Sequence, residues 1–226
     1  MTLPAGEAKV RAVENMFDRI APRYDLLNRM LTFGMDVGWR RRTVASLGLP
    51  RGSRVLDVAC GTGDLCRELL ASGYEAFGVD RSAGMLAAAR TSAPLVRADA
   101  LCLPVPDGSV DGIVCGFALR NFVSLVPFFA ECARALRPRG RVALLEVSEP
   151  ANPLLRLGHA AYFGRVVPLV GGLVSDRAAY QYLPKSVAYL PAEAEMLGQL
   201  AAAGFPDARR LPLSVGIAQL LTGTRA

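Results

Sequence analysis

The segment from Arg54 to Asp64 combines an acid, an apolar run and a glycine turn in an order that suits a nucleoside ligand. It reads Arg54-Val-Leu-Asp-Val-Ala-Cys-Gly-Thr-Gly-Asp64. Gly61 and Gly63 carry no side chain where a ligand would lie against the backbone, and glycine adopts positive φ without steric cost. About 20 residues further on, Asp80 closes the next apolar run, which suits a carboxylate that binds ribose hydroxyls. The acids and the glycine turn therefore predict a nucleoside-containing cofactor.

Two phosphate-binding interpretations of this turn fail. A dinucleotide fingerprint requires Gly or Ala three residues after Gly63, where this chain has Cys66. No Gly-Lys-Ser/Thr follows, so the turn is not a P-loop. S-adenosylmethionine contains a ribose and a cationic sulfonium but no phosphate, and it fits what remains. The turn predicts this cofactor, with an ordinary glycine turn of an α/β domain as the alternative.

The composition predicts one domain that does not span a membrane. The chain has 226 residues, 52% of them hydrophobic, with a mean hydropathy of +0.29. No uninterrupted apolar run reaches the ~18 residues of a spanning helix, and the N-terminus lacks the pattern of a secretory signal. We therefore expect a cytoplasmic protein, and leave open a peripheral contact with the inner face of a membrane.

The net charge of +6 and the pI of 9.4 are carried almost entirely by arginine, since Lys9 and Lys185 are the only lysines. Such a charge can attract nucleic acid or anionic phospholipid. The densest cluster, Arg40-Arg41-Arg42, is not part of a long basic tract interleaved with aromatic residues. The charge alone therefore decides neither partner.

The cysteines and the one histidine argue against a metal site. Cys60, Cys66, Cys102, Cys115 and Cys132 form no Cys-x-x-Cys pair and have no flanking histidine. Such residues are typical of small buried side chains in a reducing compartment. His159, the single histidine, is expected on a covering helix. We predict no metal ligands and no disulfides.

Strand-like and helix-like segments alternate through the middle of the chain. The predicted strands are Arg54–Cys60, Glu75–Asp80, Pro94–Ala98, Gly112–Phe117 and Arg141–Val147. The predicted helices are Asp64–Ser72, Ala83–Ser92 and Ser124–Leu136. We expect Ser82 to cap a helix, and Gly73 and Gly140 to end helices. This alternation predicts an α/β fold with a mostly parallel sheet.

Ligands of such sheets bind at the carboxyl ends of the strands. Asp57, Asp80, Asp99 and Arg120 all lie at or just beyond predicted strand ends. We therefore expect them along one edge of the sheet.

We predict a single domain over residues 1–226, made of four parts. Residues 1–49 form an N-terminal helical cover, 50–149 the cofactor-binding core, 150–191 a lid over the substrate, and 192–226 a C-terminal helix and strands. Within the last part, Arg209–Arg225 is expected to form a β-like pair. The apolar segment that opens the lid suits a helix that packs on its own domain, or one that admits an apolar substrate from a bilayer surface.

Several narrow motifs indicate a family. They are Asn15-Met-Phe-Asp-Arg-Ile-Ala-Pro-Arg-Tyr-Asp-Leu-Leu-Asn28, Gly34-Met-Asp-Val-Gly-Trp-Arg40, Asp80-Arg-Ser-Ala-Gly-Met-Leu86, Gly116-Phe-Ala-Leu-Arg-Asn-Phe122 and Ala179-Tyr-Gln-Tyr-Leu-Pro-Lys-Ser186. Together with the glycine turn, they closely resemble the ubiquinone/menaquinone biosynthesis C-methyltransferase family over almost the whole chain. The glycine turn alone is common to all class I methyltransferases, whereas the other motifs are much narrower.

The resemblance implies a class I S-adenosylmethionine-dependent methyltransferase fold, Rossmann-like, with a mostly parallel seven-stranded sheet. It implies that Asp57, Gly61 and Gly63 hold the methionine part of the cofactor. Asp80 would hold the ribose, and Asp99-Ala100 the adenine edge. Thr62 and Arg81, within the same motifs, are assigned to the same cofactor site.

The resemblance also implies the acceptor, a ring carbon of a lipophilic prenylated quinol. Arg120, Asn121 and Tyr24 match the positions that face the quinol ring, with Arg120 expected to stabilise a phenolate. Three departures from the family pattern make the substrate less certain than the reaction. They are Ala118 in place of Gly, Pro138-Arg-Gly140 in place of Pro-Gly-Gly, and Glu146-Val-Ser-Glu-Pro150 in place of Glu-Phe-Ser-Lys-Pro.

The expected reaction converts demethylmenaquinol to menaquinol, and three alternatives stay open. The acceptor could be a ubiquinone precursor or another small apolar molecule, such as a polyketide or a sterol. A nucleic-acid partner is not expected, because base amino-methyltransferases typically carry an Asn/Asp-Pro-Pro-Tyr/Phe turn where this chain has Leu119-Arg-Asn121. The chain could also bind the cofactor without catalysis. Whether it forms a homodimer is left open.

Overall fold

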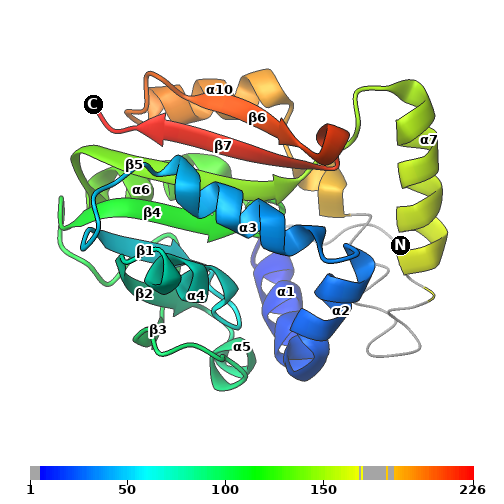
Figure 1. The fold of residues 1–226 in the computed structure, drawn as a ribbon, viewed down its shortest axis with the longest axis horizontal. Helices are drawn as coiled ribbons and strands as arrows, with labels where there is room; N and C mark the ends of the chain where they lie inside the picture. The colour runs from blue at the N-terminus through cyan, green and yellow to red at the C-terminus, as the bar shows by residue number, and fades with distance from the viewer. Residues whose placement is uncertain (1–5, 168, 170–181, 183–185) are drawn as a thin grey trace.

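The strands predicted from the sequence form one sheet in the computed structural model, which describes residues 6–167, 169, 182 and 186–226. The strands are β1 (Arg54–Val58), β2 (Glu75–Asp80), β3 (Leu95–Arg97), β4 (Val110–Gly116), β5 (Leu136–Val147), β6 (Arg209–Leu213) and β7 (Ala218–Thr224). Their order is β3-β2-β1-β4-β5-β7-β6 (Figure 1). β1 to β5 are parallel, and β7 pairs antiparallel with β5 and β6. The mostly parallel sheet and the terminal β pair are confirmed.

Helices cover both faces and one end of this sheet. They are α1 (Gly6–Ile20), α2 (Tyr24–Leu31), α3 (Met35–Ser46), α4 (Asp64–Ala71), α5 (Ala83–Ala87), α6 (Leu125–Ala135), α7 (Pro153–Ala161) and α10 (Glu193–Ala202), with a π-helical turn at Tyr162–Val166 and short 3-10 turns at Ala21–Arg23, Leu119–Asn121, Val187–Tyr189 and Ser214–Gly216. In Figure 1, α3 and α4 lie on the near face and α6 and α10 on the far face. α1, α2 and α7 lie at the end to which the parallel strands point. No helix of the described part is long and apolar enough to cross a bilayer.

The strand side chains divide between two core clusters because successive residues of a strand point to opposite faces. On β1, Val55 packs with the α3 and α4 side, whereas Leu56 packs with α6 and α10. On β4, Val114 and Ile113 divide in the same way. All four side chains are fully buried. Burial on both faces explains why these strands are continuous apolar runs in the sequence.

Local turn chemistry at Ser82 and Gly73 is as predicted, whereas Gly140 was assigned wrongly. The Ser82 hydroxyl caps α5 by accepting a hydrogen bond from the Met85 amide at 3.0 Å. Gly73 follows α4 with a φ of 84°. Gly140, expected to end a helix, lies inside β5. A Cβ there would come within 2.8 Å of the Arg137 carbonyl oxygen, so glycine is required by a close backbone approach within the strand.

Other element boundaries also differ from the prediction. α5 ends at Ala87 instead of Ser92, because the backbone turns back and the Arg90 amide donates to the Thr62 carbonyl at 3.0 Å. β1 ends at Val58 because Ala59 has a φ of 56°. Of the late motif at residues 179–186, only Tyr182 and Ser186 belong to the described residues.

Two glycines offer a matched test of the core. A Cβ on Gly78, in β2, would lie 2.8 Å from the Cys60 sulfur and 2.8 Å from Leu95 Cδ2, whereas a Cβ on Gly198, in α10, would meet nothing within 4 Å. We expect Gly78→Ala to lower the free energy of unfolding by roughly 1–3 kcal/mol, because overpacking forces neighbours apart. Gly198→Ala should raise it by roughly 0.5–1 kcal/mol, since alanine favours the helix.

Urea unfolding followed by circular dichroism measures both variants. A Gly78→Ala protein as stable as the wild type would contradict the packing described around β2.

Candidate active site

A cavity of about 160 Å³ lies at the carboxyl ends of β1, β2 and β4. Chain order in the sheet reverses between β1 and β4, which is where ligands of such sheets bind. Its walls include Gly61, Asp80, Arg81, Asp99 and Ala100, all of them assigned to the cofactor from the sequence. Helix α1 covers it, with Val10, Val13, Glu14 and Phe17 among the lining residues. We refer to it below as the cofactor cavity.

The Asp80 carboxylate is anchored at this cavity by two backbone amides. The Gly61 amide donates to Oδ2 and the Ser82 amide to Oδ1, each at 2.8 Å. Burial raises the pKa of Asp80, and these amide bonds act in the opposite direction. A Cβ at Gly61 would meet only the Met85 sulfur, at 4.0 Å, so the turn leaves room beside the carboxylate. An anchored acid beside an open turn fits the ribose of a nucleoside.

Arg81 and Asp99 bind each other across the cavity edge. The Arg81 guanidinium lies 2.7 Å from the Asp99 carboxylate and 2.9 Å from Glu14 of α1. Arg97 also reaches Glu14, at 2.8 Å. These ion pairs join α1 to the strand ends. A further bond joins α1 to α5, since the Asp18 carboxylate accepts a hydrogen bond from the Gly84 amide at 2.9 Å.

Asp57, at the end of β1, and Thr62 and Gly63, in the glycine turn itself, are not among the residues that line the cofactor cavity. Asp57 is buried; its Oδ2 lies 3.3 Å from the Cys66 sulfur, and Oδ1 has no hydrogen-bond partner among the described residues. Burial raises the pKa of Asp57 to about 7. The Thr62 hydroxyl instead donates to Asp25 of α2. Among the described residues, Asp57 therefore contacts α4 and Thr62 contacts α2, and neither faces the cofactor cavity.

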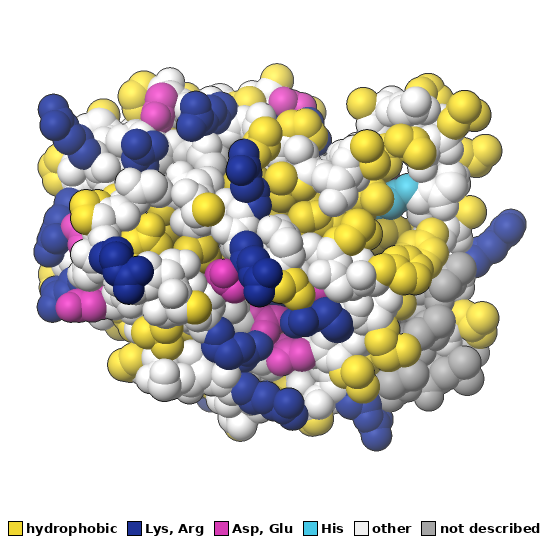
Figure 2. Space-filling model, in the orientation of Figure 1, with side chains coloured by type: hydrophobic (Ala, Val, Ile, Leu, Met, Phe, Trp, Pro, Cys, Tyr) yellow, Lys and Arg dark blue, Asp and Glu magenta, His cyan; other side chains and the backbone are white. Residues whose placement is uncertain are grey.

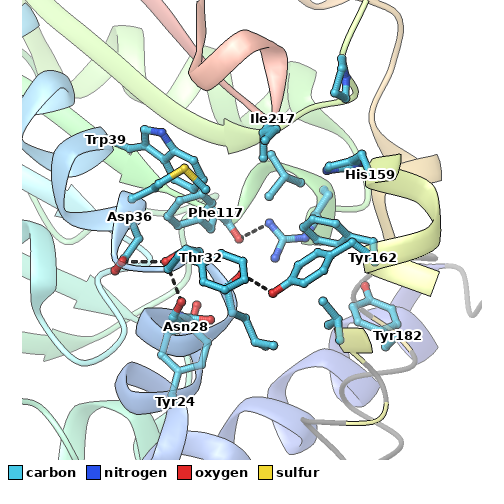
Figure 3. A pocket seen from close by; sticks show the side chains of 18 of the residues that line it. Tyr24, Asn28, Thr32, Asp36, Trp39, Phe117, His159, Tyr162, Tyr182 and Ile217 are labelled. Atoms are coloured by element: carbon cyan, nitrogen blue, oxygen red, sulfur yellow. Dashed lines mark hydrogen bonds between the residues drawn. The ribbon is translucent and has the colours of Figure 1, made fainter. Parts of the chain in front are cut away.

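A second, larger cavity of about 400 Å³ lies beside the first (Figure 3). Its lining is mostly apolar and comes from α1, α2, α3, α7, the end of β4 and the turn before β7. His159 projects into it from α7, where its ring lies 4.3 Å from that of Phe163. Its Nε2 is buried and has no partner among the described residues. We refer to this space as the acceptor cavity.

The two cavities share a wall made of Phe17, Tyr24, Phe117 and Asn121. Phe117 follows β4 with a φ of 59°, a strained conformation for a bulky residue. Its amide nevertheless stays bonded to the Leu145 carbonyl, at 2.7 Å. Backbone strain of this kind is often found where a side chain must be placed for function. Asn121 and Tyr24, both assigned to the acceptor from the sequence, are therefore also neighbours of the cofactor cavity.

Arg120 lies in the acceptor cavity wall and is paired with Glu146, near the end of β5. Both side chains are almost completely buried, and Nη1 of Arg120 bonds Oε1 of Glu146. The other carboxylate oxygen accepts the Arg120 backbone amide at 3.1 Å. Nη1 also donates to the Phe117 carbonyl at 2.7 Å, and Nε to the Ser186 hydroxyl at 3.1 Å. Glu146 thus fixes both the backbone and the side chain of Arg120.

Lys9 of α1 holds the same turn from the opposite side. Its ammonium donates to the Arg120 carbonyl at 2.9 Å and the Phe122 carbonyl at 2.7 Å, and lies 3.6 Å from the centre of the Tyr189 ring. Burial lowers the pKa of Lys9 to about 8. Within the same turn, Asn121 Oδ1 accepts a hydrogen bond from the Tyr182 hydroxyl at 3.3 Å.

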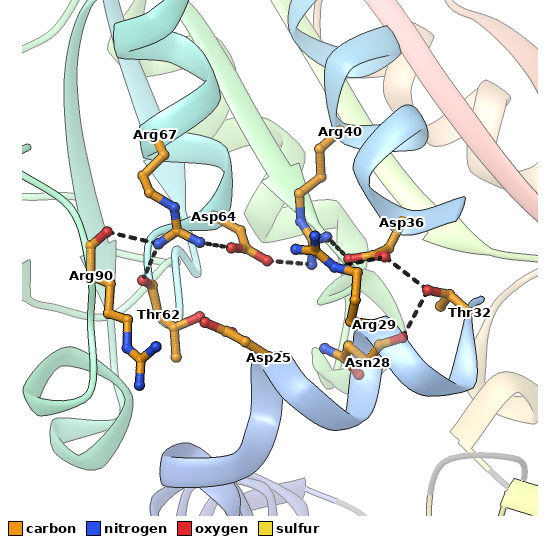
Figure 4. A network of polar contacts seen from close by, with 10 residues as sticks. All are labelled: Asp25, Asn28, Arg29, Thr32, Asp36, Arg40, Thr62, Asp64, Arg67 and Arg90. Carbon is orange, nitrogen blue, oxygen red and sulfur yellow. Dashed lines mark hydrogen bonds and ion pairs between the residues drawn. The ribbon is translucent and has the colours of Figure 1, made fainter. Parts of the chain in front are cut away.

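A polar network joins the acceptor cavity to the glycine turn (Figure 4). The Arg40 guanidinium bonds Asp36 on its own helix and lies 2.9 Å from Asp64, the first residue of α4. Thr32 donates to Asp36 at 2.8 Å. Asp36 and Arg40 line the acceptor cavity. Arg40 therefore connects the wall of the acceptor cavity to the end of the glycine turn, which lies beside the cofactor cavity.

Sequence reasoning missed Glu146, Lys9 and the pair Asp36–Arg40. Glu146 carries the same signal as Asp80, an acid that ends an apolar strand. Lys9 is one of only two lysines in an arginine-rich chain, which could have marked it. Ala118, one of the departures from the family pattern, lines the cofactor cavity and not the acceptor cavity.

A model of the ubiE/COQ5 methyltransferase family matches residues 4–225. A relative from Thermus thermophilus named demethylmenaquinone methyltransferase is 44% identical over 221 residues, covering 93% of this chain and 100% of the relative. The ubiquinone/menaquinone biosynthesis C-methyltransferase UbiE of Syntrophotalea carbinolica is 42% identical, covering 93% of each chain. A solved SAM-dependent methyltransferase of Thermotoga maritima superimposes with a TM-score of 0.67 at 18% identity, covering 94% of this chain and 99% of that one, which shows the same fold.

The buried Asp57 predicts a specific dependence of stability on pH. Because its pKa rises from 3.8 to about 7 on folding, the folded state holds a proton that the unfolded state has released. The native state therefore loses stability as pH rises through this window, by at most ~4 kcal/mol. Asn does not ionise, so Asp57→Asn removes this pH-dependent loss. The free energy of unfolding of the variant, relative to that of the wild type, should therefore be greater at about pH 8 than at about pH 5.

Asp207→Asn is the matched control, because hydrogen bonds from Thr224 lower the pKa of Asp207. It should lose stability equally at both pH values, since Asp207 is ionised throughout. Urea unfolding at each pH measures both differences. A stability gain for Asp57→Asn that did not change with pH would contradict the raised pKa.

Proposed function

The chain belongs to the ubiE/COQ5 methyltransferase family, and on this basis we propose that it transfers a methyl group from S-adenosylmethionine to a ring carbon of a prenylated quinol. The expected reaction converts demethylmenaquinol to menaquinol, a step of quinone biosynthesis. The observation that supports it best is the wall shared by Phe17, Tyr24, Phe117 and Asn121. A methyl donor and an aromatic acceptor held on its two sides would be neighbours.

The residues of the cofactor cavity fit S-adenosylmethionine, which supplies an electrophilic methyl group on a positively charged sulfur. Asp80 would bind the ribose hydroxyls, since its carboxylate is already oriented by the amides of Gly61 and Ser82. Asp99 and Ala100 would lie along the adenine edge. Helix α1 would exclude water from the site, because its side chains close the cavity opposite the strand ends.

The acceptor cavity fits a quinol ring and the beginning of an apolar tail. A ring carbon becomes nucleophilic when a neighbouring hydroxyl loses its proton, because the phenolate delocalises charge onto that carbon. Arg120 would stabilise this phenolate through a guanidinium held by Glu146 in a water-poor wall. It would not act as the base, since the pKa of arginine is about 12.5 or higher. Burial raises the pKa of Tyr24, so its hydroxyl stays protonated and can donate a hydrogen bond.

The purified protein, supplied with S-adenosylmethionine, tests the reaction with a short-tailed demethylmenaquinol. We expect a product heavier by one methylene when the substrate is kept reduced, and no product from the oxidised quinone, because only the quinol can form a phenolate. A demethylated ubiquinone precursor assayed in parallel distinguishes the two head groups. Mass spectrometry of the extracted lipid measures both. No transfer to any quinol would refute the proposed function.

The pair Arg120–Glu146 allows stability and catalysis to be separated. Arg120→Met alone leaves Glu146 buried and uncompensated, which should cost about 3–5 kcal/mol of stability. The double variant Arg120→Met/Glu146→Met removes both charges and should recover most of that loss. We expect it to bind S-adenosylmethionine normally in calorimetry, yet to lose about 100- to 1000-fold in kcat. Recovery of kcat together with stability would show that Arg120 has only a structural role.

A further inference from the structure

Two left-handed turns place large apolar side chains in solvent at the opening of the acceptor cavity. Phe33, which follows α2, has a φ of 52° and is 78% exposed. Val215, in the turn before β7, has a φ of 53° and is 71% exposed. Both residues line the acceptor cavity. A bulky or β-branched residue at positive φ is a genuine outlier, and holding it there lowers the stability of the folded state.

Neither packing nor local conformation accounts for these two residues. Glycine would satisfy the backbone at both positions, since each side chain buries little surface. Among the described residues, the ring in contact with Phe33 is that of Tyr162, 5.8 Å away at a tilt of 37°. The sequence therefore keeps an apolar side chain in water at two strained positions on the same opening.

Helix α7 completes this opening with a third exposed side chain. Leu154, which also lines the acceptor cavity, is 81% exposed, and α7 contains no buried residue. The π-helical turn that follows α7 is tied to the end of α2, where the Tyr162 hydroxyl donates to the Leu31 carbonyl at 2.9 Å. Figure 2 shows hydrophobic side chains gathered over this end of the molecule, around a hollow. Phe33, Leu154 and Val215 are called the apolar mouth below.

The charges beside the apolar mouth are mostly positive. Residues 153–166 contain Arg156 and Arg165 and no acid. Along 21–36, Asp25 is bonded to Thr62 and Asp36 lies 3.4 Å from Arg29, so the positive charge at the mouth comes mainly from Arg23, Arg156 and Arg165. Apolar side chains flanked by arginine are typical of a surface that enters the interface of an anionic bilayer. A second copy of this chain would instead bring like charges together.

We infer that the apolar mouth inserts into the surface of an anionic lipid bilayer, so that the acceptor cavity opens directly into the membrane. This rests on the proposed function, because a prenylated quinol resides in the bilayer and could then enter the cavity without crossing water. The strain at Phe33 and Val215 is retained because these side chains are buried by lipid when the protein is bound. The partner is a phospholipid surface that carries anionic headgroups.

The double variant Phe33→Gly/Val215→Gly tests this inference. Because it relieves strain, we expect its thermal midpoint to rise, while its affinity for vesicles of phosphatidylcholine and phosphatidylglycerol falls by about tenfold or more. Wild-type binding should weaken on vesicles of phosphatidylcholine alone and at high salt. Co-sedimentation measures binding without turnover, so the result is independent of whether the quinol reaction occurs.

Val96→Ser/Val126→Ser is the matched control. Val96 and Val126 are 48% and 54% exposed and line neither cavity, so their replacement should leave vesicle binding unchanged. Affinity for S-adenosylmethionine should equal the wild-type value in both double variants, which shows that the cofactor cavity is intact. Wild-type protein that does not bind the anionic vesicles would overturn the inference. So would equal binding by the Phe33→Gly/Val215→Gly variant, or a dimer in ultracentrifugation that this variant abolishes.

Discussion

The buried ion pair between Arg120 and Glu146 is the interaction on which the rest of the site depends. It joins the turn after β4 to the end of β5, and Glu146 binds the backbone amide of Arg120 as well as its guanidinium. The carbonyl of the same residue is bonded by Lys9 from α1. A lone charge at this depth would be very costly, so the pair restricts the turn to one arrangement. That arrangement sets the wall between the cofactor and acceptor cavities.

Helix α1 and the helices after it make the two cavities parts of one structure. Glu14 and Asp18 bind residues beside the cofactor cavity, while Lys9 binds the turn that carries Arg120. Further along, Arg40 connects the acceptor cavity wall to the first residue of α4. The N-terminal helices are thus bonded to elements beside both cavities. Ordering of these helices over a bound cofactor would shape the acceptor cavity too, because the same helices line both.

Four of the six positive-φ non-glycine residues in the described part of the chain line one of the two cavities, whereas Arg139 and Ser214 line neither. Ala59 and Phe117 have positive φ at the ends of β1 and β4, beside the cofactor cavity, and Phe33 and Val215 have positive φ at the apolar mouth. Stability alone would favour glycine at such positions. In the core, packing has the opposite effect. Gly78 is required there because a Cβ would collide with its neighbours. Residue choice thus follows backbone and packing preferences in the core, and departs from the preference for glycine at positive φ around the ligand cavities.

The sequence by itself determined the parallel sheet, the N-terminal helices, the cap at Ser82 and the place of Gly61, Asp80 and Asp99 at one edge. These follow from periodicity, turn chemistry and strand ends, which depend on near neighbours in the chain. Only the tertiary structure decided that Asp57 is buried against Cys66, that Gly140 is inside a strand, and that Glu146 neutralises Arg120. Each depends on which distant backbones meet: Lys9 is 111 positions from the carbonyl it binds. No local pattern encodes such a contact, because it exists only once both faces of the sheet are packed.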